Sequence, residues 1–144
     1  MNEEGIKLNI IGDINGLPDY VQENIHYAID ETKNNKKFIL NLAANYGSHD
    51  EILNAVKNIM KSGINPDELT KEKFEQYLYT YNLPSVDLLI RTSGEMRISN
   101  FLLWQIAYAE FELTDTLWPD FSKEEFLDIL IAYQTRKRRY GDIK

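Results

Sequence analysis

The spacing of hydrophobic residues predicts a strand, a helix and a second strand in the first third of the chain. Residues 6–12 alternate briefly between apolar and polar side chains and end before the turn-prone residues 13–16, a pattern typical of a buried strand. Pro18 suits the first turn of a helix, whose apolar face contains Val21, Ile25, Ala28 and Ile29. A second apolar run, at residues 37–43, predicts the next strand.

Another helix is expected after this second strand. Ser48 and Glu51 have the spacing of a capping box, in which each side chain bonds a free backbone N–H group at the helix start. Gly63 predicts the end of the helix, and its buried stripe consists of Ile52, Leu53, Val56, Ile59 and Met60. A shorter helix is predicted at residues 69–79, ahead of Pro84.

The second half of the chain repeats the alternation of strands and helices. Residues 86–91 form a nearly continuous apolar run and predict a third strand, followed by a helix at 99–109 and a short strand at 112–116. A last helix opens with a second capping box, Ser122 with Glu125, and its inward residues are Phe126, Ile129, Leu130 and Tyr133.

This order of elements predicts the fold class. Strands that are separated by helices are joined by crossover connections, which place them parallel in one sheet. We therefore predict an α/β fold with a mainly parallel sheet and helices on both faces. Because the chain has no internal repeat, low-complexity tract or long linker, residues 1–144 are predicted to form a single domain.

The composition and charge of the chain exclude several classes of function. The formal net charge of -7 disfavours a nucleic acid partner, because such partners require many phosphates to be neutralised. The absence of cysteine excludes disulfides, thiolate nucleophiles and zinc–cysteine sites. No apolar run approaches the roughly 20 residues that cross a bilayer, and the acidic start is unlike a secretion signal. A cytoplasmic protein is expected.

A basic cluster near the end of the chain stands against this acidic background. It consists of Arg136, Lys137, Arg138 and Arg139. One interpretation is a solvated helix end whose cations meet the negative end of the helix dipole. The alternative is a local anion-binding site.

The strongest candidate chemistry lies just after the predicted strands, where ligands gather in an open parallel sheet. Asn45 follows the second strand, and residues 91–100 follow the third. Arg91 and Arg97 can each offer paired N–H donors to phosphate oxygens, while Ser99 is expected to add a hydroxyl at a helix start. Alternatively, Ser99 is only a helix cap and the arginines pair with Glu95.

The sequence motifs are more specific than this chemistry. Six of them resemble the cis-prenyltransferases, the undecaprenyl diphosphate synthase type, and together they extend over nearly the whole chain. They are IGD at 11–13, NLAANYG at 41–47, RTSGEMRISNFLLWQ at 91–105, AYAEF at 107–111, LWPDF at 117–121 and the closing RYG at 139–141.

The resemblance implies a transferase that joins isopentenyl diphosphate to an allylic prenyl diphosphate, with Mg²⁺ as cofactor. The residues that match the family's substrate-binding positions are Arg91, Arg97, Ser99, Asn45, Arg139 and Gly141. Glu110 matches a residue that helps to hold the metal. A diphosphate leaving group needs its developing charge neutralised by fixed cations and metal, so these roles are chemically coherent.

Departures from the family pattern matter as much as the matches. Ser48 and His49 stand where the family commonly has glycine and arginine. The family's opening Asp-Gly-Asn-Gly-Arg segment, which carries the catalytic aspartate and grips the allylic diphosphate, has no counterpart in this sequence, and residues 13–16 only superficially resemble it. We therefore expect the C-terminal portion of a cis-prenyltransferase domain, without a catalytic residue of its own.

Two functions follow as hypotheses. In the first, the chain supplies the isopentenyl diphosphate half-site of a prenyltransferase and works as a homodimer or with a complementing N-terminal chain. In the second, it is a non-catalytic homologue or accessory subunit that binds a partner or diphosphate without turnover. In either case apolar surface is expected to be left uncovered, and a lipid product would bring the protein to a membrane surface.

Overall fold

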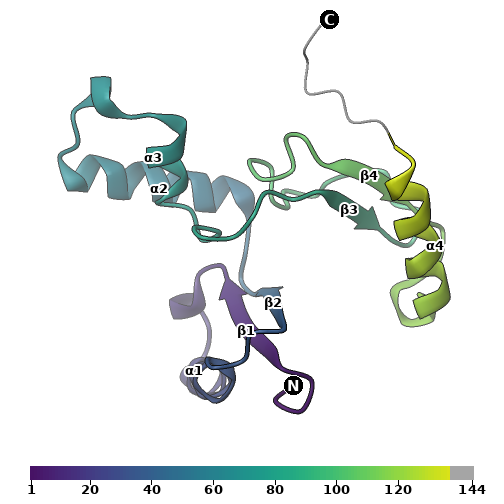
Figure 1. The fold of residues 1–144 in the computed structure, drawn as a ribbon. Helices are drawn as coiled ribbons and strands as arrows, with labels where there is room; N and C mark the ends of the chain where they lie inside the picture. Colours follow the sequence, from purple (N-terminus) through teal and green to yellow (C-terminus); the bar gives the residue numbers. More distant parts are fainter. Residues whose placement is uncertain (137–144) are drawn as a thin grey trace, which may run out of the picture. The chain divides into compact units, whose positions relative to one another are not determined.

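The computed structural model describes residues 1–136, which belong to two compact units, Met1–Leu83 and Pro84–Lys144. Figure 1 shows the ribbon of both units. The predicted sites at Arg139 and Gly141 lie outside the described residues. No helix in the described part of the chain is both long and apolar enough to span a membrane.

The first unit begins with the predicted strand, helix and strand. Strand β1 (Ile6–Ile11) pairs in parallel with β2 (Phe38–Ala43), and helix α1 (Asp19–Thr32) makes the connection between them and packs on β1 (Figure 1). The buried Thr32 hydroxyl accepts the Leu8 N–H at 3.0 Å and donates to the Ala28 carbonyl at 2.8 Å. This hydroxyl therefore links the end of α1 to the middle of β1.

Helices α2 (Ser48–Ser62) and α3 (Lys71–Glu75) complete the first unit, with a 3-10 turn at Pro66–Glu68 between them. As predicted, Gly63 ends α2, in a left-handed conformation with φ of 70°. The helix predicted at 69–79 is shorter, because only its first part is α-helical and the backbone then continues in turns.

The capping box predicted for α2 is wrong. Gly47 occupies the N-cap position, so Ser48 is already the first helical residue. Glu51 is almost fully buried, and its carboxylate accepts the Tyr46 hydroxyl at 2.6 Å and the Tyr79 backbone N–H at 2.9 Å. A residue expected to cap a helix therefore joins the segments before α2 and after α3 instead.

The second unit contains another parallel pair and the last helix. Strand β3 (Leu88–Arg91) pairs with β4 (Glu110–Leu113), and helix α4 (Lys123–Gln134) follows a 3-10 turn at Trp118–Asp120. Strand β4 lies slightly before the predicted range. The Ser122 cap is confirmed, because its hydroxyl accepts the Glu125 N–H at 3.0 Å.

The helix predicted at residues 99–109 does not form. Ser99, Asn100 and Leu102 have positive φ angles of 54°, 61° and 49°, which a right-handed helix cannot contain. The segment continues as turns, with local bonds such as that from the Ile106 N–H to the Leu102 carbonyl at 3.0 Å.

The α/β class with parallel strands is confirmed, and each unit contains one parallel pair, β1 with β2 in the first and β3 with β4 in the second. In the first unit, all six residues of β2 are exposed although most are large and apolar.

Candidate functional site

A cavity of about 530 Å³ lies beside the end of β3 in the second unit. Its walls come from β3, from most of the residues at 92–98 and from Phe101. Both predicted anion-binding arginines, Arg91 and Arg97, line it, together with the hydroxyl residues Thr92 and Ser93. The fold therefore brings together the central part of the predicted diphosphate site.

The loop that forms this cavity is held by the chain that continues from β4. The Ser93 N–H donates to the Thr116 carbonyl at 2.8 Å, and the Gly94 N–H donates to the Thr114 carbonyl at 2.9 Å. Gly94 has φ of 64°, and a Cβ atom at this position would lie 3.0 Å from a carboxylate oxygen of Asp115. Glycine is thus required both by the backbone conformation and by a close neighbour.

The two arginines are held differently. Arg97 pairs with Glu95, while 66% of its side chain remains exposed. An exposed ion pair of this kind is worth about 0–1 kcal/mol, so a phosphate group can compete for the guanidinium. Arg91 is half-buried at the end of β3, and its carbonyl accepts the Thr114 N–H at 2.9 Å. Arg91 therefore belongs to the framework of the loop as well as to the cavity wall.

Two other predicted site residues do not line this cavity. Ser99 is not one of its lining residues, and its positive φ removes the helix start that was expected to present backbone N–H groups. Asn45 belongs to the first unit, where its side-chain amide donates to the Asp13 carbonyl at 2.9 Å and its own carbonyl accepts the Asp13 N–H at 3.2 Å. These bonds tie the loop after β1 to the loop after β2.

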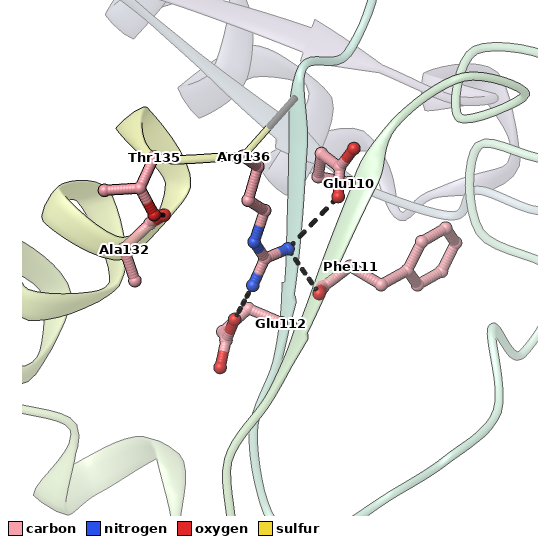
Figure 2. A network of polar contacts seen from close by, with 6 residues as sticks. All are labelled: Glu110, Phe111, Glu112, Ala132, Thr135 and Arg136. Atoms are coloured by element: carbon pink, nitrogen blue, oxygen red, sulfur yellow. Dashed lines mark hydrogen bonds and ion pairs between the residues drawn. The ribbon is translucent and has the colours of Figure 1, made fainter. Parts of the chain in front are cut away.

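Glu110, the predicted metal residue, lies at the start of β4 and pairs with Arg136. Figure 2 shows the Arg136 guanidinium beside β4, where Nη1 lies 3.3 Å from Glu110 Oε2 and 2.9 Å from the Phe111 carbonyl oxygen, while Nη2 pairs with Glu112. This contact was not predicted from the sequence. The alternation of glutamates at 110 and 112 indicates that both side chains lie on one face of a strand, but it does not identify their partner.

The described residues do not by themselves form a site for Mg²⁺. This ion demands near-octahedral oxygen coordination, whereas no group of three or more His, Cys, Asp or Glu side chains able to hold a metal gathers within residues 1–136. Glu110 moreover already has a cationic partner in Arg136.

Comparisons with known proteins identify the family to which the chain is similar. Residues 1–141 match the family model for undecaprenyl diphosphate synthase. The chain is 47% identical to an isoprenyl transferase of Oceanobacillus iheyensis, with 98% of this chain and 58% of the relative covered. It is 50% identical to a Pasteurella multocida ditrans,polycis-undecaprenyl-diphosphate synthase named as specific for (2E,6E)-farnesyl diphosphate, with 98% and 60% covered. The chain thus spans about three fifths of the length of these relatives.

Solved structures show the same similarity in three dimensions. A probable undecaprenyl diphosphate synthase from Campylobacter jejuni is 36% identical with a TM-score of 0.87, covering 99% of this chain and 66% of that one. Lavandulyl diphosphate synthase from Lavandula x intermedia, solved with dimethylallyl diphosphate, is 40% identical with a TM-score of 0.90, covering 95% and 61%.

Proposed function

Because the chain belongs to the cis-prenyltransferase family that includes undecaprenyl diphosphate synthase, we propose that it supplies the half-site that binds the diphosphate of isopentenyl diphosphate. The observation that carries this proposal is the cavity beside β3, which Arg91 and Arg97 both line. Two guanidinium groups and two hydroxyls around one hollow favour a ligand with several anionic oxygens.

The electrostatics of the loop support a diphosphate more than a carboxylate. Each guanidinium presents a planar fork of donors that matches two oxygens of a phosphate group, so two arginines match two phosphate groups. The hydroxyl groups of Thr92 and Ser93 lie on the same wall. Because no helix begins at Ser99, no helix dipole adds positive charge, and the charge of this site comes from the side chains of Arg91 and Arg97.

We propose an allylic prenyl diphosphate as the second substrate of the complete enzyme. The names of the relatives support this class, since the Pasteurella enzyme is named for farnesyl diphosphate and the Lavandula enzyme holds dimethylallyl diphosphate. Mg²⁺ remains our prediction for the cofactor of that complete enzyme, with Glu110 as the residue of this chain that would help to hold it. A single carboxylate cannot satisfy the ion, so the other ligands would come from elsewhere.

We propose further that the chain alone does not elongate a prenyl substrate and associates with a second copy or with a complementing segment. The exposed apolar residues of β2 support association. The second candidate function, a binding subunit without turnover, is favoured by one observation: Glu110 is paired with Arg136, and within residues 1–136 it belongs to no group of three or more His, Cys, Asp or Glu side chains able to hold a metal.

Calorimetry with isopentenyl diphosphate tests the half-site. Arg97→Lys keeps the charge but loses the bidentate fork, so binding should weaken by about 1–3 kcal/mol with little change in stability. Arg91→Lys should lower both affinity and the melting temperature, because the Arg91 side chain is half-buried at the end of β3. Lys33→Gln, which removes an exposed cation paired with Asp30 in the first unit, is the matched control and should bind normally.

Two results would contradict this proposal. One is a folded wild-type chain that binds neither isopentenyl diphosphate nor inorganic diphosphate. The other is an Arg97→Lys variant that melts far below the wild type while diphosphate binding is unchanged, since Arg97 would then be a structural residue.

A further inference from the structure

The segment that carries the two cavity arginines, residues 91–97 or the arginine loop, has a backbone conformation that its own sequence disfavours. Ser93 and Gly94 are both left-handed, with φ angles of 70° and 64°. Such an angle is uncommon for a residue with a side chain and persists only where surrounding contacts hold it. The conformation that places Arg91 and Arg97 on one cavity therefore depends on contacts from outside the loop.

Thr114, the residue after β4, supplies the central contacts to this loop. Its carbonyl accepts the Gly94 N–H at 2.9 Å, and its own N–H donates to the Arg91 carbonyl at 2.9 Å. The Ser93 N–H donates to the Thr116 carbonyl at 2.8 Å, and the Thr116 N–H in turn donates to the Thr114 hydroxyl oxygen at 3.2 Å. Both left-handed residues are thus bonded to one short turn, and the position of that turn decides the position of the arginine loop.

Glu125 attaches this turn to helix α4. The Thr114 hydroxyl donates to a carboxylate oxygen of Glu125 at 2.5 Å, and both residues are half-buried. The length is that of a charge-assisted hydrogen bond, which is roughly twice as strong as a bond between neutral groups. The backbone of Glu125 is also fixed, because its N–H donates to the hydroxyl of the Ser122 cap at 3.0 Å. Neither Thr114 nor Glu125 lines the cavity, so the carboxylate acts on a ligand there only through the loop.

We propose that Glu125 is a positioning residue for the arginine loop. Through the Thr114 hydroxyl it holds the turn at 114–116, and the turn holds Ser93 and Gly94 in their left-handed conformation. This inference rests on the proposed function in one respect, because the purpose assigned to the arrangement is the binding of a diphosphate. It adds a residue of α4, outside the cavity wall, that sets the affinity of the site.

Two measurements on the full chain test this role, amide hydrogen exchange by nuclear magnetic resonance and calorimetry with inorganic diphosphate. Glu125→Ala and Thr114→Val each remove the bond between these two side chains. In both variants the amides of Ser93 and Gly94 should exchange at least about tenfold faster, and diphosphate should bind roughly tenfold more weakly. Thr114→Ser keeps the hydroxyl and should stay within about threefold of the wild type in both measurements.

Two control variants separate this role from charge and from stability. Glu124→Ala removes an exposed carboxylate from the same turn of α4, so it matches the change in charge. Ser122→Ala removes the helix cap and should lower the melting temperature, while the bond between Thr114 and Glu125 remains. Both controls should leave the exchange of Ser93 and the affinity for diphosphate at wild-type values.

The proposal is overturned if Glu125→Ala leaves the exchange rates or the diphosphate affinity unchanged, or if Ser122→Ala reproduces its effects. If Glu125→Ala does not fold, the comparison of Thr114→Val with Thr114→Ser decides the question, and equal results for these two variants overturn the proposal. A wild-type chain that binds no diphosphate would refute the half-site itself. The exchange rates at Ser93 and Gly94 would still show whether Glu125 holds the loop, so the two failures are distinguishable.

Discussion

Replacing the buried carboxylate of Glu51 should destabilise the chain more than any surface change nearby. Only 1% of Glu51 is exposed, and its two oxygens accept from different partners, the Tyr46 hydroxyl at 2.6 Å and the Tyr79 backbone N–H at 2.9 Å. These partners lie on either side of helices α2 and α3. The carboxylate therefore fixes two segments that the chain connects only through more than thirty intervening residues.

The magnitude follows from these two bonds. Glu51→Gln keeps the volume and one acceptor oxygen but turns an amide N–H toward one of the two donors, so it should cost about 2 kcal/mol of unfolding free energy. Glu51→Ala removes both acceptors and leaves a cavity, which should cost about 4 kcal/mol. In a Tyr46→Phe background the Tyr46 donor is absent and the amide oxygen can face the Tyr79 N–H, so the cost of Glu51→Gln should fall by about 1 kcal/mol.

Urea unfolding followed by circular dichroism measures each value in this double-mutant cycle. Asp50→Asn is the matched control, since Asp50 is an exposed carboxylate in the same helical turn and its change should stay within about 0.5 kcal/mol. The reasoning fails if Glu51→Gln also stays within that limit with an unchanged denaturant slope, or if Tyr46→Phe leaves its cost unaltered.

Two further predictions concern the first unit. Gly12→Ala should cost at least about 3 kcal/mol of unfolding free energy in urea, because φ of Gly12 is 124° and a Cβ would overlap the Ala44 carbonyl oxygen. Gly63→Ala has open space around it and should cost about 1 kcal/mol. Equal costs for the two variants would refute this prediction. Burial, aided by nearby carboxylates, raises the pKa of Tyr79 above its usual 10.0. The stabilisation by the neutral phenol is thus complete below pH 10 and is lost as pH rises through its pKa in the folded chain. The Tyr79→Phe variant has no phenol to ionise, so its free energy of unfolding should fall less than that of the wild type between about pH 9 and 11. Parallel pH curves for the two proteins would contradict this prediction.

The hydrophobic pattern was sufficient for elements whose neighbours in sequence decide their structure. The strands at 6–12 and 37–43 appear nearly as predicted, because a short apolar run between polar turns leaves few alternatives to a strand. The Ser122 cap and the end of α2 at Gly63 were likewise predictable, since each depends on bonds or angles within one turn of the helix.

Elements that depend on distant partners were not predictable in this way. The apolar residues at 101–106 fit a helix, yet left-handed angles at Ser99, Asn100 and Leu102 exclude one. The spacing of Ser48 and Glu51 fitted a capping box, but the Glu51 carboxylate contacts Tyr79, 28 positions away. Local spacing carries no information about a partner so far along the chain. The same spacing of serine and glutamate is therefore compatible with a helix cap or with a buried hydrogen bond to a distant residue.

The candidate site was likewise predictable only where local sequence decides its structure. The motif at 91–105 predicted that Arg91 and Arg97 act together, and the structure places both on one cavity. The contact between Glu110 and Arg136 was not predictable from local spacing, because α4 and the turn before it separate the two residues in the chain. Of the basic run at 136–139, only Arg136 belongs to the described residues, where it follows the end of α4 and pairs with two carboxylates.

The arginine loop and the acidic pair are supported by the same part of the second unit. Thr114, directly after β4, accepts the N–H of Gly94 in the loop through its carbonyl, and its hydroxyl donates to the Glu125 carboxylate of α4 at 2.5 Å. Helix α4 also carries the turn from which Arg136 reaches Glu110. Because one strand end and one helix hold both groups, a movement of α4 would alter the arginine loop and the contact between Arg136 and Glu110 together.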